Sequence, residues 1–239
     1  MSDITVVSGF WNIKSKHKES DFKSWFWTTL RINCPYVIFG DKESLNILRP
    51  YRNSFQTHFI ELAIEDFYTY QYKDTIGTHE RHVPSKELNM IWNEKLFLIQ
   101  KAKELNPFQS EWFLWVDAGI CIYRNKIPPQ KPLSESKKLF ELPTDKLIFT
   151  SSEQPEFNEK EFNKDKYYHF ISGTYMIHTS SVDGFVELYK EVCQKFLTKS
   201  EWYYTDQVIL TKLYKDRPEL FHKVGHGYGK ILDYLFQSC

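Results

Sequence analysis

The sequence lacks several features that would assign it at once to a functional class. Its 239 residues contain 31 Lys and Arg and 31 Asp and Glu, so the formal net charge is zero. A balanced charge argues against a broad basic surface for nucleic acid or for an anionic membrane. The first residues do not form a secretory signal, and no apolar run approaches the length that spans a bilayer. We therefore expect a soluble cytoplasmic protein with no nucleic-acid partner and no transmembrane segment.

Cysteine and glycine are also scarce. The four cysteines are far apart and form no CxxC pair, which excludes a disulfide framework or a zinc knuckle. Three of the nine glycines lie in GHGYG at 225–229, a pattern that is neither a Walker loop nor a GxGxxG motif. Aromatic residues, in contrast, make up 17% of the chain, and their commonest use is to fill a core.

Short apolar runs alternate with segments of helical length along the whole chain. Strands are predicted at 4–10, 36–41, 57–64, 112–123, 146–153 and 169–179. Helices are predicted at 21–32, 43–52 with Pro50 closing it, 86 to just before Asn106, 180–197 and 205–216. This rhythm predicts one α/β domain over residues 1–239, with a mainly parallel sheet flanked by helices.

Polar residues follow several of these predicted strands. Ligands on open α/β sheets bind outside the carboxyl ends of the strands, so these residues are expected to meet at one rim. They are Ser8, Gly9 and Phe10, then Gly40 and Asp41, then Asp117 and Gly119, and finally Ser151 and Ser152.

Two charged residues lie in apolar surroundings. Asp117 interrupts the run FLWVDAGICIY at 113–123, and an unpaired carboxylate in such a place needs solvent, a donor or a cation. It either caps a turn, with Gly119 at positive φ, or contacts a metal or a sugar. Lys95 lies in the middle of the apolar stripe of its helix. Its ammonium either snorkels to solvent or reaches a phosphate or sugar hydroxyl under the rim.

Two further segments indicate a functional site only together with the residues already named. Asp206 and Gln207 open a helix after Thr205, where an acid is favoured by the helix dipole alone. In the glycine-rich tail, His226 can bind a metal and Lys230 can neutralise a phosphate, or the tail is a flexible turn before a final helix.

The stretch NMIWNEKLFLIQKAKELNPFQSEWFLWVDAGI at 89–120 resembles the hallmark of the HtrL/YibB (WlaTC/HtrL) family, and ITVVSGFWNI and YVIFGD resemble its first two strands. Members of this family resemble GT-A glycosyltransferases. The resemblance implies a GT-A-like, Rossmann-like fold and transfer of a sugar from a nucleotide sugar, with a UDP-sugar as the leading donor. The implied acceptor is a glycan or lipid-linked glycan in surface polysaccharide, lipooligosaccharide or glycoconjugate synthesis, which leaves peripheral membrane attachment open.

A more distant resemblance is to the glycogenin-type retaining transferases. The motifs of that group occur here in the same order along the chain. Lys95 matches its helix lysine, Asp117 matches its Asp-x-Asp strand, and Ser172 and Gly173 match its Ser-Gly strand. An Asp-Gln helix start matches Asp206 and Gln207, and a His-x-x-Gly-x-x-Lys segment matches His226, Gly229 and Lys230 loosely. The chain departs from the pattern at Gly119, which replaces the second carboxylate.

The resemblance implies a role for each of these residues. Asp206 would stabilise an oxocarbenium-like centre with Gln207 beside it, and retention of configuration is expected unless Asp206 acts as a base. The donor would contact Ser8, Gly9, Phe10, Asp41, Lys95, Asp117, Gly119, Ser172, Gly173 and Lys230. Asp117 and His226 would hold Mn²⁺ or Mg²⁺, and a metal-free site with Lys95 and Lys230 is the rival arrangement.

Two other functions stay open. A non-catalytic relative that binds a nucleotide sugar or a glycan fits the loss of the carboxylate at Gly119. A nucleotidyltransferase on a similar sheet fits less well, because no glycine-rich basic segment follows the first predicted strand. The Tyr- and His-rich segment 66–87 is predicted to be a long loop that covers the donor, contacts the acceptor or only lies in solvent.

Overall fold

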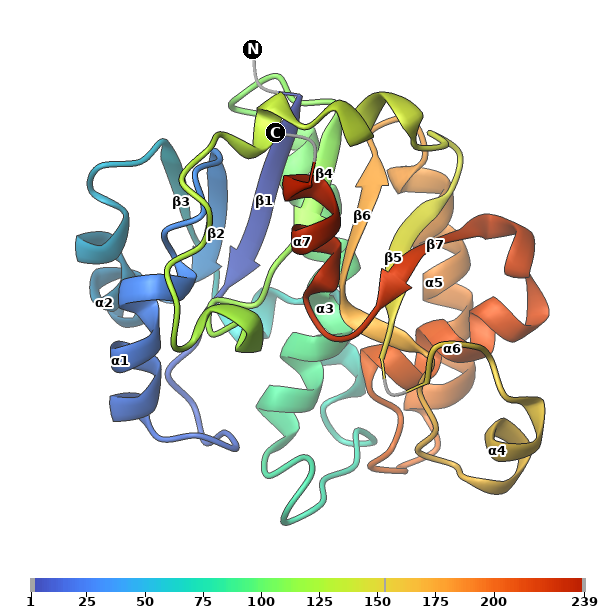
Figure 1. Cartoon of the computed structure of the whole chain (residues 1–239). Coiled ribbons are helices and arrows are strands. Elements are labelled where there is room, and N and C mark those ends of the chain that lie inside the picture. Colours follow the sequence, from blue (N-terminus) through green and yellow to red (C-terminus); the bar gives the residue numbers. More distant parts are fainter. Residues whose placement is uncertain (1–2, 153, 238–239) are drawn as a thin grey trace.

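The computed structural model describes residues 3–152 and 154–237. Their strands form one sheet of seven, in the order β3-β2-β1-β4-β6-β5-β7 (Figure 1). The strands are β1 (Ile4–Gly9), β2 (Tyr36–Gly40), β3 (Thr57–Glu61), β4 (Trp112–Trp115), β5 (Leu147–Ser151), β6 (Ile171–His178) and β7 (Phe221–His226). β6 runs antiparallel to β4 and β5, and the other strand pairs are parallel.

Helices cover both faces of the sheet (Figure 1). They are α1 (Glu19–Thr29), α2 (Lys42–Arg52), α3 (Lys86–Leu105), α4 (Glu159–Lys164), α5 (Val182–Leu197), α6 (Asp206–Asp216) and α7 (Lys230–Phe236). Successive strand side chains point to opposite faces, so Val7 and Phe113 join a core with α3, α5 and α6, whereas Val6 and Leu114 join a second core with α1, α2 and α7. The predicted class, a mainly parallel α/β sheet flanked by helices, is confirmed.

The boundaries of α3 follow from its caps. The Ser85 hydroxyl accepts a hydrogen bond from the Leu88 backbone N–H, and Asn106 adopts the left-handed conformation that ends many helices. The predicted end of this helix, just before Asn106, is confirmed.

Three local features differ from the prediction. The strand predicted at 112–123 ends at Trp115, so Asp117 lies in a turn where its carbonyl accepts from the Ile120 N–H. Helix α2 agrees with the predicted 43–52 to within one residue, but Pro50 does not close it. The helix continues to Arg52, whose buried guanidinium donates to the carbonyls of Leu30, Ile32 and Cys34. The tail ends in a helix, α7, as one reading of it predicted. Strand β7, which precedes this helix and pairs with β5 as far as His226, was not predicted.

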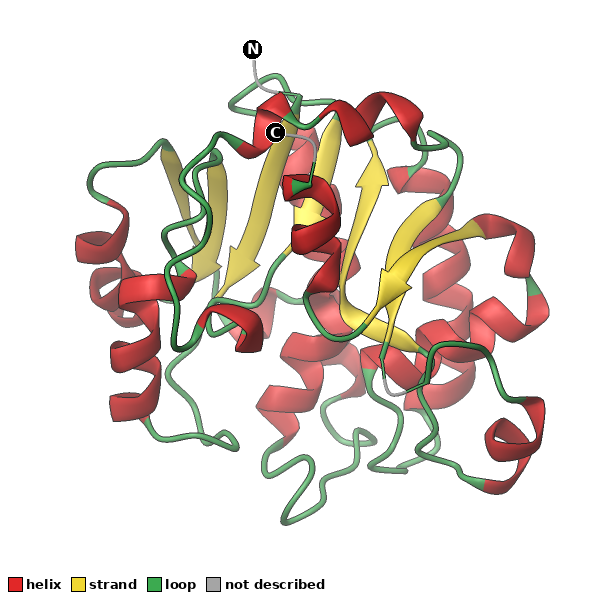
Figure 2. Ribbon diagram, viewed as in Figure 1, coloured by secondary structure: helices red, strands yellow, loops and turns green. Residues whose placement is uncertain are grey.

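Long loops lie at the edge of the sheet where the parallel strands end (Figure 2). They include the segment between β1 and α1, much of 66–85 and the segment before α6. The amino end of β6, the reversed strand, lies at this same edge. In the described part of the chain, no helix combines the length and the apolar character needed to cross a membrane.

Candidate active site

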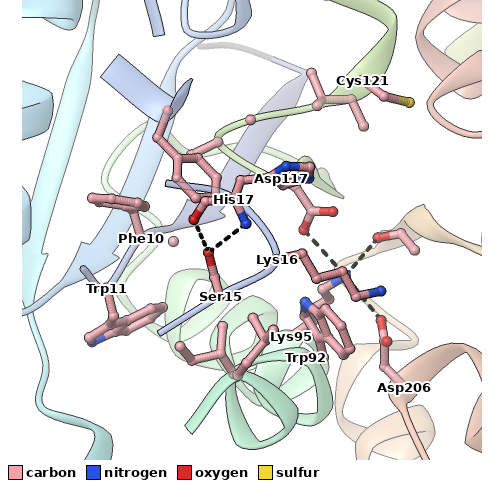
Figure 3. A pocket seen from close by; sticks show the side chains of 18 of the residues that line it. Phe10, Trp11, Ser15, Lys16, His17, Trp92, Lys95, Asp117, Cys121 and Asp206 are labelled. Atoms are coloured by element: carbon pink, nitrogen blue, oxygen red, sulfur yellow. Dashed lines mark hydrogen bonds and ion pairs between the residues drawn. The ribbon is translucent and has the colours of Figure 1, made fainter. Parts of the chain in front are cut away.

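A pocket of about 330 Å³ opens at the carboxyl edge of the sheet (Figure 3). Its walls come from the segment after β1, helix α3, the turn after β4, the start of β6 and the start of α6. The pocket therefore lies where the strand order and the polar strand ends predict a ligand site.

Lys95 of α3 is the centre of the polar part of this pocket. Its Nζ lies 3.2 Å from Oδ1 of Asp117 and 3.0 Å from Oδ2 of Asp206, and it donates to the Gly173 carbonyl at 3.2 Å. These contacts match the three hydrogens of an ammonium group. Lys95 is only 3% exposed, so the snorkelling interpretation is wrong, and its contacts are with the two acids.

Burial and the neighbouring charges have opposite effects on the pKa values of Lys95 and Asp206. Burial lowers the pKa of Lys95, but the carboxylates of Asp117 and Asp206 outweigh it, and the pKa ends above its ordinary value. Burial raises the pKa of Asp206 above its ordinary value, and the charge of Lys95 opposes that rise. Asp206 is also the first residue of α6, where the helix dipole favours a negative charge.

Asp117 differs from Asp206 in its exposure. The side chain of Asp117 is 46% exposed, against 3% for Asp206. Its Oδ1 accepts a hydrogen bond from the Trp115 indole N–H at 2.8 Å, in addition to the contact with Lys95. The exposed part of Asp117 therefore faces the pocket, whereas Asp206 is held below its surface.

Gly173 makes room for the lysine. A Cβ at this position would lie 3.0 Å from Lys95 Nζ and 3.9 Å from Asp206 Oδ2. Ser172 points elsewhere, and its hydroxyl interacts with Thr150 Oγ1 and with the Thr174 carbonyl. Of the Ser-Gly pair, only Gly173 takes part in the site, because its lack of a side chain leaves space for the Lys95 ammonium.

Among the other predicted site residues, the donor residues Gly9, Phe10 and Gly119 and the catalytic candidate Gln207 line the pocket. The Phe10 ring packs against Phe22 and Phe26, and the Gln207 amide donates to the Ile171 carbonyl at 3.1 Å.

Ser8 and Asp41 lie outside this pocket, as does Ser172. Ser8 is buried within β1, and Asp41 caps α2 by accepting from the Ser44 N–H at 2.8 Å. Any contact of these side chains with a donor stays a prediction.

The tail residues also lie outside the pocket. His226 is exposed at the end of β7, with Nδ1 3.0 Å from Ser151 Oγ, and Lys230 pairs with Asp233 in α7 at 2.6 Å. Tyr228, between them, does line the pocket. Over residues 3–152 and 154–237, no three His, Cys, Asp or Glu side chains gather as a metal-binding group.

Two cations that line the pocket were missed by the sequence analysis. Lys16 lies on the segment between β1 and α1, with its Nζ 4.9 Å from the centre of the Trp92 ring. The guanidinium of Arg124 lies 3.8 Å from the centre of the Trp25 ring, and its Nε donates to the Gly119 carbonyl at 2.9 Å. The available signal was the lysine-rich run NIKSKHK directly after the first strand.

The segment 66–87 is fixed at its start by a buried acid. Glu94 of α3 accepts from the backbone N–H groups of Tyr68 and Thr69, each at 2.9 Å, and burial raises the pKa of Glu94 to about 7. Further along, the rings of His79 and His82 lie 4.4 Å and 5.5 Å from that of Trp202.

Tyr167, which lines the pocket, lies 4.9 Å from the same Trp202 ring and 5.5 Å from that of His82. We call His79, His82, Tyr167 and Trp202 the aromatic cluster. It joins the 66–87 segment to the wall of the pocket.

Solved structures share this fold. Mouse xyloside xylosyltransferase 1 in its apo form has a TM-score of 0.57 and 13% identity, over 93% of this chain and 85% of that one. An active-site mutant of LgtC has a TM-score of 0.53 and 11% identity, over 88% of this chain and 70% of that one. At such identities the likeness shows the fold, which is that of the GT-A glycosyltransferases. No curated protein matches the chain in sequence.

A family model described as "Bacterial protein of unknown function (HtrL_YibB)" matches residues 45–238, well over half of the chain. The match begins after β1 and β2, so the resemblance of those two strands to the family stays a prediction. It includes Lys95, Asp117, Gly173 and Asp206. The chain therefore belongs to the HtrL/YibB family.

Proposed function

We propose that the protein is a glycosyltransferase that moves a sugar from a nucleotide-sugar donor to a glycan acceptor. One observation carries the proposal. Two carboxylates, Asp117 and Asp206, are held by one buried lysine at the ligand-binding edge of a glycosyltransferase fold. A buried acid fixed beside an exposed one suits a reaction in which positive charge develops on a bound sugar.

The donor would lie along the pocket from its aromatic end to Lys95. The nucleotide occupies the part lined by Gly9, Phe10 and Trp11, where an aromatic ring can contact the base. Asp117 accepts hydrogen bonds from ribose or sugar hydroxyls through Oδ2, since Oδ1 is held by Trp115 and Lys95. A UDP-sugar is the leading donor.

In the reaction, the bond between the sugar's anomeric carbon and the diphosphate oxygen breaks, and its electron pair leaves with the nucleoside diphosphate. The acceptor hydroxyl then bonds to the anomeric carbon, and its proton passes to the departing diphosphate. The carboxylate of Asp206 stabilises the positive charge on the sugar, and Lys95 is a positioning residue that holds this carboxylate in place. Retention of configuration is the expected outcome, and NMR of the product's anomeric proton tests it.

The aromatic cluster would contact the acceptor. Aromatic rings present flat apolar surfaces to the C–H faces of sugars, and Tyr167 links the cluster to the donor pocket. An acceptor bound on the aromatic cluster would lie beside the donor pocket, next to the 66–87 segment.

A second candidate is a binding protein with the same fold and no turnover. The observation that favours it is Gly119, which supplies no carboxylate at the position where the glycogenin-type pattern has one.

A panel of UDP-, GDP-, dTDP- and CMP-sugars separates the two candidates. Thermal shift measures binding, and release of the nucleoside phosphate measures slow hydrolysis of the donor. A transferase binds at least one nucleotide sugar and releases its nucleoside phosphate. Binding without release or transfer to any glycan supports the second candidate, and the absence of binding to every nucleotide sugar contradicts the transferase.

A further inference from the structure

We propose that Lys16 and Arg124 hold the diphosphate of the donor, and that this pocket needs no divalent metal ion. This inference rests on the proposed function and goes beyond it, because it names the charges that replace a metal. It depends on three features: the oxygen atoms that the pocket offers to a metal, the packing around Gly119, and the positions of Lys16 and Arg124 on the pocket wall.

The carboxylates of the pocket offer few free oxygen atoms to Mn²⁺ or Mg²⁺, because other side chains already engage them. Asp117 Oδ1 already contacts the Trp115 N–H and the Lys95 ammonium, so only Oδ2 faces outward. Asp206 is 2% exposed and paired with Lys95. The remaining carboxylate of the pocket wall, Glu19, is engaged by Lys23 and by the Asn12 amide.

A side chain at position 119 would be tightly packed. A Cβ there would lie 3.2 Å from two atoms of the Phe22 ring and 3.3 Å from Trp25. Phe22 packs on the ring of Phe10 at 5.4 Å, and Trp25 packs under the guanidinium of Arg124 at 3.8 Å. A side chain in place of Gly119 would therefore have to displace these aromatic rings slightly. His226 does not line the pocket, so the predicted pair of metal ligands, Asp117 and His226, does not meet there.

Arg124 presents unused donors to the pocket. Its Nε is bound to the Gly119 carbonyl at 2.9 Å, which fixes the plane of the guanidinium against Trp25. Within the described residues, its two terminal nitrogens donate no hydrogen bond. A guanidinium with a fixed plane and two free amino groups suits bidentate binding of a phosphate.

Lys16 is the second available cation. Its ammonium lies over the Trp92 ring and forms no ion pair with any residue that the structure describes. Burial lowers the pKa of Lys16, and the charge of Asp206 opposes this; burial also lowers the pKa of Arg124, and Cys121 and Asp117 oppose it. Both cations line the same pocket as the two acids that Lys95 holds.

The chemistry follows from this placement. As the bond to the anomeric carbon breaks, negative charge grows on the departing diphosphate. Lys16 and Arg124 stabilise that charge, while Asp206 of the same pocket stabilises the positive sugar. Both sites are preorganised, since Trp25 supports Arg124 and Lys95 supports Asp206.

Isothermal titration with UDP, GDP, CDP and dTDP tests this inference, once in EDTA and once in Mn²⁺. We expect at least one nucleoside diphosphate to bind with a Kd that differs by less than about twofold between the two buffers. In EDTA, Lys16→Gln and Arg124→Gln should each weaken that binding about tenfold or more, since each removes a charge-assisted contact. Lys14→Gln is the matched control, because Lys14 is exposed on the same segment and does not line the pocket.

The outcomes are separable. Binding that appears only with Mn²⁺ overturns this inference and leaves the proposed function intact. Equal losses in Lys14→Gln and Lys16→Gln also overturn it, because the effect then comes from the general charge of the segment. If no nucleoside diphosphate binds in either buffer, the inference falls, and the panel of nucleotide sugars alone decides the proposed function. Lys16 lies on an exposed loop, so its variant is expected to fold even if the Arg124 variant does not.

Discussion

At the scale of single residues, the site depends on a buried ammonium shared by two carboxylates. Such a group contributes little to stability on balance, because burying charges costs about as much as their attraction returns. Its value lies in position: Lys95 fixes Asp206 from α6 against Asp117 from the turn after β4. Removing the lysine leaves a buried carboxylate without its partner.

Lys95→Met should change the pH dependence of turnover. The charge of Lys95 opposes the rise that burial causes in the pKa of Asp206. Without it the pKa of Asp206 rises further, so Asp206 becomes protonated at a higher pH as the solution is acidified. The acid limb of the kcat profile should therefore move to higher pH, whereas Lys101→Met, on the same helix outside the pocket, leaves it in place. An unmoved limb in Lys95→Met argues against this role for the lysine.

Gly173→Ala tests the space left for the lysine. The added methyl would meet Lys95 Nζ at 3.0 Å, displace the ammonium and destabilise the protein by about 1–3 kcal/mol. Urea unfolding measures this change. Gly184→Ala, in helix α5 with open space around it, should instead stabilise the protein by about 0.5–1 kcal/mol. Equal effects of the two substitutions would show that Gly173 has no special role.

The sequence predicts which residues are unusual but not which partners they have. Asp117 and Lys95 attract attention because each places a charge in an apolar pattern. Lys95 joins Asp117 in a turn to Asp206 at the start of α6, which lies 89 residues further along the chain (206 − 117). Periodicity within one element carries no information about such a contact. Lys16 and Arg124 were missed for the opposite reason, because a lysine or arginine in a loop is ordinary.

At the scale of elements, α2 shows how a tertiary contact overrides a local signal. Pro50 predicts an end to the helix, yet the chain stays helical to Arg52. The guanidinium of Arg52 is 1% exposed and donates to the carbonyls of Leu30, Ile32, Cys34 and Gln56. It joins α2 to the segment between α1 and β2.

Arg52→Met should therefore destabilise the fold by about 3 kcal/mol or more, because it leaves several buried carbonyls without a donor. Arg49→Met, one turn earlier and exposed on the Phe59 ring, should cost less than about 1 kcal/mol. Urea unfolding of both variants gives the comparison. A small effect of Arg52→Met would mean that water replaces the guanidinium.

The aromatic cluster makes a prediction for the acceptor side. Trp202→Ala removes the ring that His79, His82 and Tyr167 share. The KM for the acceptor should rise about tenfold, with the KM for the donor unchanged. Trp27→Ala is the control, since Trp27 is 61% exposed on α1 and does not line the pocket. Equal changes in the two KM values, or no change, contradict an acceptor role.

The bounds of helices and strands were predicted well where the hydrophobic periodicity is strong. They were predicted badly where the segment is mostly polar. Helix α3 and strands β1 and β2 agree with prediction to within one residue. Strand β7 contains His222, Lys223, Gly225 and His226, so only its pairing with β5 makes it a strand. The predicted strand at 112–123 was too long because apolar residues after Asp117 fill the core from a turn.

At the scale of the whole molecule, one reversed strand in a mainly parallel sheet brings distant motifs to one edge. Because β6 runs antiparallel to its neighbours, its amino end carries Gly173 to the edge where β1 and β4 end. The chain order of the motifs predicted a common site, and the topology explains how they meet. The donor, the acceptor and the stereochemical outcome depend on contacts that no single motif encodes.

The most direct measurement is donor binding and turnover in Asp206→Asn beside the wild type. The amide keeps the size of the side chain and removes the charge that the proposed reaction needs. With a nucleotide sugar that the wild type hydrolyses or transfers, Asp206→Asn should bind with a similar Kd and release the nucleoside diphosphate at least about 100-fold more slowly. Release at the wild-type rate by Asp206→Asn would contradict the account.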